Sequence, residues 1–111
     1  MSDLTTKRCV PCNESTPRIP PEEVTRLIKS LPGYTADVLV GSIAKVYLFK
    51  DFYETMAFVN AVAFIANRED HHPDLAVSYN RCVVTYSTHA IGGLSQNDFI
   101  CAAKIEALLQ P

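Results

Sequence analysis

The chain has 111 residues, of which 48% are hydrophobic and 20% are charged, and its formal net charge is -2 at pH 7. This length fits one domain with a small hydrophobic core, which self-association would extend. No run of basic residues and no aromatic RNA-binding motif is visible, so the composition argues against direct binding of nucleic acid. No apolar stretch approaches the ~18 residues of a membrane span, and no apolar signal segment opens the chain, so we expect a cytoplasmic protein.

Residues 1–19 are polar, contain prolines and lack periodicity, which predicts an extended N-terminal arm. The arm holds a CxxC pair, Cys9 and Cys12. A zinc ribbon or finger needs a second pair of ligands at a set spacing, which the chain lacks. We therefore interpret the pair as part of a loose segment. Cys82 and Cys101 fall in a predicted strand and a predicted helix, where a thiol usually acts as a small hydrophobic side chain.

Residues 20–111 form the predicted single domain, which opens with a helix and two strands. The helix is expected to begin at the proline pair 20–21, because proline suits the first turn of a helix. It is expected to end at Pro32, because proline followed by Gly33 stops a helix. Its apolar stripe consists of Val24, Leu27, Ile28 and Leu31. Enrichment in β-branched and aromatic residues then predicts two strands in residues 34–50, with a turn at residues 40–42.

The second half of the domain predicts a long helix, two strands and a last helix. A D-x-x-E capping box begins the long helix at Asp51, and its broad apolar face continues to about Arg68. Strands are expected near residues 75–80 and 82–89, and Ser95 caps the last helix. Alternation along the second of these strands predicts a buried face formed by Cys82, Val84, Tyr86 and Thr88. The outward face would consist of Val83, Thr85 and Ser87.

The element order is therefore α-β-β-α-β-β-α. Hairpins joined through helices imply an α+β fold, in which a four-stranded antiparallel sheet carries its helices on one face. The other face and the sheet edges then need cover. Because the outward residues of the 82–89 strand are mixed and not charged, we expect this face to support a homo-oligomer.

The three histidines of the chain lie close to one predicted site: His71 and His72 directly precede Pro73, and His89 follows eighteen positions after His71. Imidazole has an unperturbed pKa of about 6.5, so this grouping points to acid–base chemistry or to metal binding. Proline ends the long helix here. Adjacent rings at such a point flank an extended ligand more easily than they share one ion. Asp98 stands in the first turn of the last helix, where a capping role alone would also explain an acid.

At these positions the chain resembles the pterin-4a-carbinolamine dehydratases. The matching motifs are His-His-Pro at 71–73, Tyr79, Ser-Thr-His at 87–89 and Gly-Leu-Ser at 93–95 through Asp98, with further similarity at 45–52 and 58–62. The resemblance covers roughly residues 20–110. It implies an enzyme of tetrahydrobiopterin recycling that removes water from 4a-hydroxytetrahydrobiopterin to give quinonoid dihydrobiopterin. It further implies that no metal or cofactor is needed and that the protein is a homodimer or homotetramer.

The resemblance also implies roles for single residues. Elimination of water requires a proton delivered to the 4a hydroxyl and another withdrawn from N5 of the ring, which two imidazoles in opposite protonation states can do. His71 and His89 would be this acid–base pair, in either order. His72 would grip the pterin, and Asp98 would fix a histidine or the ring. The remaining substrate-binding residues would be Pro73, Thr88 and Tyr79.

One position departs from the family pattern. Members often carry Glu four residues before the first histidine, where this chain has Asn67. An amide holds a ring by hydrogen bonding but supplies no charge, so protonated His71 would be less favoured. Glu69 and Asp74 are expected to be solvated.

Three other functions stay open on the sequence alone. Some animal members of the family also serve as dimerisation partners of a homeodomain transcription factor, a non-catalytic role. Some dehydratase-like proteins are tied to molybdopterin metabolism, and both ligands are pterins. A metal site of three histidines and Asp98 fits the ligand types, but it requires His71 and His72 to converge.

Overall fold

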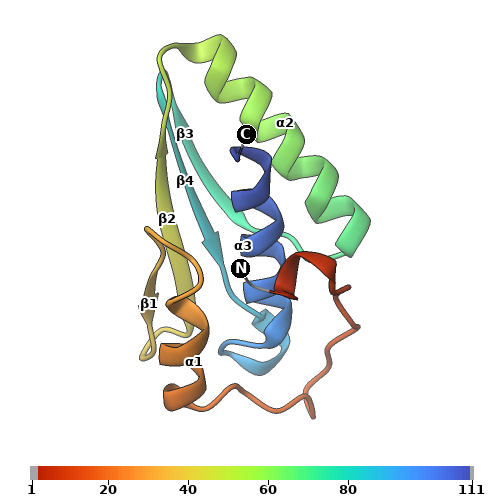
Figure 1. Ribbon diagram of the computed structural model, residues 1–111. Helices are drawn as coiled ribbons and strands as arrows, with labels where there is room; N and C mark the ends of the chain where they lie inside the picture. The colour runs from red at the N-terminus through yellow and green to blue at the C-terminus, as the bar shows by residue number, and fades with distance from the viewer. Residues whose placement is uncertain (1–2, 111) are drawn as a thin grey trace.

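The computed structural model describes residues 3–110, which form a four-stranded sheet with helices packed against it (Figure 1). In chain order the elements are η1 (Asp3–Thr6), α1 (Pro21–Ile28), β1 (Thr35–Asp37), β2 (Ser42–Leu48), α2 (Phe52–Glu69), β3 (Asp74–Ser78), β4 (Arg81–Tyr86), η2 (His89–Ile91) and α3 (Gln96–Leu108). The α+β class and the order of helices and strands predicted from the sequence are confirmed. Among the described residues, no helix combines the length and apolar character needed to cross a bilayer.

All strand pairs are antiparallel, and the spatial order is β1-β2-β4-β3. The predicted buried face of β4 is confirmed, because Cys82, Val84 and Tyr86 are fully buried against the helices. Successive strand residues point to opposite faces. The outer face of the sheet, which includes Val46 and its partner Val83, therefore points away from the helices. Val46 is 47% exposed, so the described residues leave this part of the face open to solvent.

The two long helices begin as their capping residues predict. The Asp51 carboxylate accepts a hydrogen bond from the Glu54 N–H (2.9 Å) and so satisfies a free donor at the start of α2. The helix ends at Glu69, because Asp70 adopts the left-handed conformation with φ 53°. Ser95 and Asp98 form a capping box at the start of α3. The left-handed residue turns the chain out of α2, so the residues after it no longer follow the helical register.

The strand predicted at 82–89 is shorter in the structure. β4 ends at Tyr86, and Thr88 forms an isolated bridge with Gly93. The chain therefore bends after the strand, and His89 begins the 3₁₀ helix η2. The buried side chain of Thr88 still continues the inward face of β4, as the alternation predicted.

The N-terminal arm is packed against the domain, so the interpretation of its CxxC pair as part of a loose segment is wrong. Leu4 is 3% exposed and belongs to the hydrophobic core, and η1 lies on α3 (Figure 1). Further along, the Arg18 Nε donates to the Ile91 carbonyl (2.8 Å) and the Ile19 N–H donates to the Leu94 carbonyl (2.9 Å). A polar, proline-containing segment thus finds partners that are distant in sequence, which local periodicity does not reveal.

Candidate active site

A cavity of about 550 Å³ lies where the end of α2, the start of η2, α3 and the N-terminal arm meet. Its volume is in the range of small-molecule sites. It brings together four of the residues expected from the sequence, His71, His72, Thr88 and His89. The other lining residues are Cys9, Val10, Pro11, Cys12, Arg68, Glu69, Asp70, Ser87, Ala90 and Asn97.

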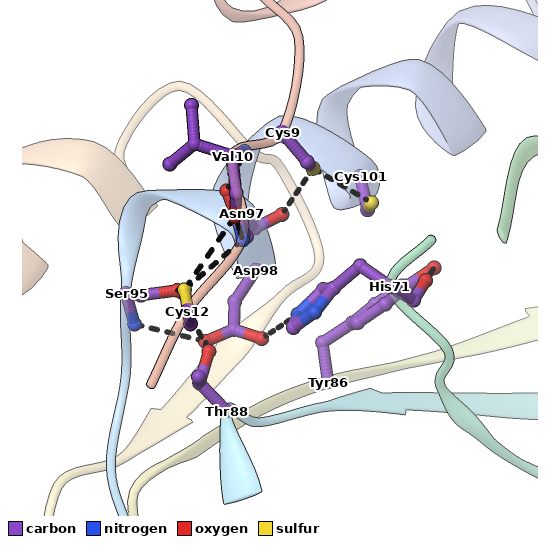
Figure 2. A network of polar contacts seen from close by, with 10 residues as sticks. All are labelled: Cys9, Val10, Cys12, His71, Tyr86, Thr88, Ser95, Asn97, Asp98 and Cys101. Carbon is purple, nitrogen blue, oxygen red and sulfur yellow. Dashed lines mark hydrogen bonds and ion pairs between the residues drawn. The ribbon is translucent and has the colours of Figure 1, made fainter. Parts of the chain in front are cut away.

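Asp98 is the fully buried carboxylate beneath this cavity, and it fixes His71 (Figure 2). Its Oδ1 lies 2.6 Å from Nε2 of His71. Its Oδ2 accepts hydrogen bonds from the Thr88 hydroxyl (2.8 Å) and the Ser95 N–H (3.0 Å). The capping role and the role of fixing a histidine are therefore filled by the same side chain. Because Nε2 faces Asp98, Nδ1 is the nitrogen of His71 that remains for proton exchange with a ligand.

The charge of Asp98 also sets the protonation of His71. Burial alone would lower the pKa of His71, but the hydrogen bond and the negative charge of Asp98 raise it, and the net pKa lies above the ordinary histidine value. The His71 side chain is only 12% exposed, so water screens this interaction weakly. The pair therefore favours the imidazolium form of His71.

Tyr86 holds His71 from the sheet side, a role that the sequence reasoning missed. The two rings are stacked with centroids 5.3 Å apart and an interplanar angle of 11°. The Tyr86 hydroxyl donates to the His71 carbonyl (3.2 Å). Burial raises the pKa of Tyr86 and so keeps its hydroxyl protonated. The available signal was strand alternation, because Tyr86 and Thr88 share the inward face that leads to the site.

His72 and His89 occupy more exposed places at the same cavity. The Nε2 of His72 contacts Oδ1 of Asn67 (3.1 Å). Asn67 therefore holds His72 and not His71, which differs from the expectation of one helical turn between Asn67 and His71. The cause is the left-handed Asp70, which removes both histidines from the helical register. His89 is exposed and contributes to the cavity from the first position of η2.

Besides Asp98, which lies beneath the cavity, two expected substrate-binding residues are not among those that line it. Pro73 is half-buried between His72 and β3. Tyr79 is 63% exposed in the β3–β4 turn, and its carbonyl accepts a hydrogen bond from the Thr55 hydroxyl (2.9 Å) in the first turns of α2. The site lies at the other end of α2, where Glu69 is about 21 Å from Thr55 along the helix axis. Because β3 runs away from the histidines, the structure does not bring Tyr79 to the cavity.

Glu69 is buried, so the expectation that it is solvated is wrong, whereas Asp74 is exposed as expected. The Glu69 carboxylate accepts the Cys9 N–H (2.8 Å) and forms ion pairs with Arg8 (3.0 Å) and Lys104 (3.8 Å). Burial alone would raise the pKa of Glu69, but these three partners lower it below the usual range. Glu69 therefore anchors the arm at the edge of the cavity.

Asn97 holds the arm at a second point, which the sequence reasoning also missed. Its Oδ1 accepts the Val10 N–H (3.1 Å), and its Nδ2 donates to the Val10 carbonyl (2.7 Å). Asn97 is 4% exposed, so these bonds satisfy a buried amide. The sequence feature that could have indicated this role is a polar residue placed between Ser95 and the apolar run of α3. The arm thus forms a wall of the cavity.

Among residues 3–110, no group of three or more His, Cys, Asp and Glu side chains is arranged to hold a metal ion. The two adjacent rings have different partners, since His71 faces Asp98 and His72 faces Asn67.

Comparison with known proteins supports the resemblance of the histidine motifs to those of the pterin-4a-carbinolamine dehydratases. The profile of the family described as "Pterin 4 alpha carbinolamine dehydratase" matches residues 17–108. A relative from Nitrosospira multiformis is 56% identical over 99% of this chain and 96% of its own length, and one from Nitrosomonas eutropha is 51% identical over 96% and 94%. Both relatives carry that enzyme's name provisionally.

Two solved structures share the fold. A transcriptional coactivator/pterin dehydratase from Brucella melitensis has a TM-score of 0.81 and 30% identity, covering 85% of this chain and 100% of that one. A pterin dehydratase-like protein identified as a RuBisCO assembly factor in the alpha-carboxysome has a TM-score of 0.56 and 20% identity, covering 68% of this chain and 84% of that one. The profile match and the full-length relatives place the chain in the pterin-4a-carbinolamine dehydratase family.

Proposed function

We propose that the protein dehydrates 4a-hydroxytetrahydropterins by histidine acid–base catalysis and so returns the pterin cofactor of aromatic hydroxylation to its recycling route. The observation that carries the proposal is the buried Asp98 carboxylate bound to His71, at a cavity that His89 also lines. A buried carboxylate that favours one protonation state of a cavity-lining histidine is typical of acid–base sites. The family membership supplies the substrate class.

His71 and His89 have different environments, which supports different roles. Asp98 favours protonated His71, so His71 is the acid that delivers a proton to the 4a hydroxyl as the C–O bond breaks and water leaves. His89 is more exposed and accepts the proton from N5 of the ring. Both rings must return to their starting protonation states after each turnover, and proton exchange with solvent is easier at the exposed His89. Each proton transfer contributes on the order of 10²–10⁴-fold to the rate.

The other residues position these groups or bind the substrate. The Thr88 hydroxyl is occupied by Asp98 and by the Ser95 hydroxyl (2.7 Å), so Thr88 is a positioning residue. His72, oriented by Asn67, contacts the pterin and contributes to binding in the ground state and the transition state alike. Val10 and Pro11 of the arm provide apolar contact for a planar ring.

A dehydratase assay on a freshly generated 4a-hydroxytetrahydropterin tests the proposal, with the uncatalysed dehydration subtracted. We expect His71→Ala and His89→Ala each to lose most of kcat and His72→Ala mainly to raise KM. Tyr79→Phe is the matched control, because Tyr79 lies away from the cavity, and its activity should equal that of the unmodified protein. A chelator should leave the rate unchanged. Inhibition by EDTA that zinc reverses would contradict the acid–base mechanism.

A non-catalytic role is the second candidate, and the similar protein from Brucella melitensis, which is described as both a transcriptional coactivator and a pterin dehydratase, favours it. This role predicts a folded protein without dehydratase activity whose His71→Ala variant behaves like the unmodified protein in every assay. Substrate-dependent activity that falls in His71→Ala would exclude it as the sole function.

A further inference from the structure

Two cysteines from opposite ends of the chain meet beside the active-site cavity. Sγ of Cys9, in the arm, lies 3.5 Å from Sγ of Cys101, in α3, and the two residues are 92 positions apart in the sequence (Figure 2). Both are free thiols. The distance exceeds a disulfide bond of ~2.0 Å by about 1.5 Å. Cys9 lies in a segment without regular secondary structure, so a small movement of the arm is enough to close it.

The other two cysteines are not placed to compete for this contact. Cys12 also lines the cavity, but its sulfur accepts a hydrogen bond from Nδ2 of Asn97 (3.2 Å) and lies 3.9 Å from the Ser95 hydroxyl. Cys82 is fully buried in β4. Although Cys9 and Cys12 have CxxC spacing, the fold therefore places Cys9 next to Cys101 and not next to Cys12.

The surroundings of the pair favour thiol chemistry. The hydrogen bond between Cys9 and Cys101 lowers the pKa of Cys101; burial opposes this effect, and Tyr86 and the charge of His71 lower the pKa further. The thiolate is the reactive form of cysteine. Cys9 lines the cavity, so a small oxidant that enters the cavity reaches the pair.

We propose that Cys9 and Cys101 form a reversible disulfide site that ties the N-terminal arm to α3 at the wall of the cavity. The proposal rests on the position and chemistry of the two sulfurs and not on the proposed dehydratase activity, so either can fail without the other.

A peroxide is the oxidant that fits the cavity. One sulfur attacks hydrogen peroxide as a thiolate; an S–O bond forms, the O–O bond breaks, and hydroxide leaves and takes up the thiol proton to give water. The second sulfur then attacks the sulfenic acid, forms the S–S bond and releases a second water. Each sulfur is oxidised by one electron and the peroxide is reduced by two. A thiol reductant reverses the reaction by thiol–disulfide exchange.

The bond would change how the arm is held. In the reduced protein, hydrogen bonds and ion pairs of Glu69 and Asn97 hold the arm, and these can open without breaking a covalent bond. A bond between residues 92 positions apart closes a long loop in the unfolded chain and so favours the folded state.

The test uses the reduced full-length protein, titrated with hydrogen peroxide, alkylated and mapped by mass spectrometry without reduction. We expect a cross-linked peptide joining Cys9 to Cys101, with Cys12 and Cys82 still alkylated and the cross-link lost after dithiothreitol. We also expect the oxidised protein to unfold at a temperature several degrees higher than the reduced protein. Cys12→Ser, the matched control, should keep both effects, and Cys9→Ser should abolish both.

Other products would overturn the proposal. A Cys9–Cys12 cross-link would show that sequence spacing and not the fold decides the pairing. A cross-link between two chains, or over-oxidation of Cys9 to sulfinic acid without any cross-link, would show that Cys101 does not reach it. The mapping of the unmodified protein decides among these products, so the conclusion does not depend on whether a variant folds.

Discussion

Replacing Asp98 by asparagine tests the link between the buried carboxylate and His71 most directly. The amide keeps the shape of the side chain but removes its charge, and its nitrogen cannot accept from His71, Thr88 or Ser95. The 2.6 Å contact with Nε2 of His71 is short enough to be charge-assisted. The substitution therefore removes a strong hydrogen bond from a ring that is only 12% exposed.

A hydrogen bond to a charged group contributes about 1.5–3 kcal/mol. If this interaction is present in the transition state, its loss slows kcat by about 10- to 150-fold, since each ~1.4 kcal/mol is a factor of ten. The pKa of His71 should fall in Asp98→Asn, because the group that raises it above the ordinary value is gone. The pH–rate limb that requires protonated His71 should therefore move to lower pH.

The same change affects stability in a pH-dependent way. A histidine whose folded-state pKa is raised stabilises the fold fully below the unfolded pKa, about 6.5, and this contribution is lost as pH rises through the folded pKa. The stability advantage of the unmodified protein over Asp98→Asn should thus be larger at about pH 5.5 than at about pH 8.5.

Three measurements check this reasoning: NMR titration of the His71 ring, a pH–rate profile, and thermal unfolding at the two pH values. Thr88→Val is the matched control, because it removes one hydrogen bond of Asp98 and leaves its charge in place, so the pKa of His71 should stay raised. A His71 titration that is unchanged in Asp98→Asn, with superimposable pH–rate profiles, would refute the argument.

Three other substitutions test neighbouring contacts and the outer face of the sheet. Asn67→Glu should alter KM and its pH dependence through His72, and a shift in the His71-dependent limb of kcat would instead favour the helical register expected from the sequence. Glu69→Gln should destabilise the protein by about 1.5–3 kcal/mol near neutral pH. Because the pKa of Glu69 is lowered, this loss, measured by calorimetry, should shrink as pH falls from about 4.3 through the folded pKa of Glu69; an equal loss at acid pH would contradict the ion-pair assignment. The outer face of the sheet should mediate a homo-oligomer, which Val46→Lys would weaken in light scattering; a monomer at micromolar concentration would contradict this prediction.

Local patterns in the sequence determined the elements of the fold, because each depends on residues that are neighbours in the chain. The capping residues Asp51 and Ser95 predicted the starts of the two long helices, and both are confirmed. Strand alternation predicted the buried face of β4. The histidine spacing indicated which residues share a site, and His71, His72 and His89 do line one cavity.

The tertiary structure alone decided which partner each of these side chains has. Because Asp70 is left-handed, His72 contacts Asn67, whereas His71 contacts Asp98, which is 27 positions away in the sequence. The direction of β3 carried Tyr79 away from the cavity. The arm has no periodic pattern, so its position depends on contacts with residues far away in the sequence, such as that of Cys9 with Cys101, 92 positions away. Periodicity and capping report on neighbours along the chain, whereas these partners depend on how the chain closes on itself.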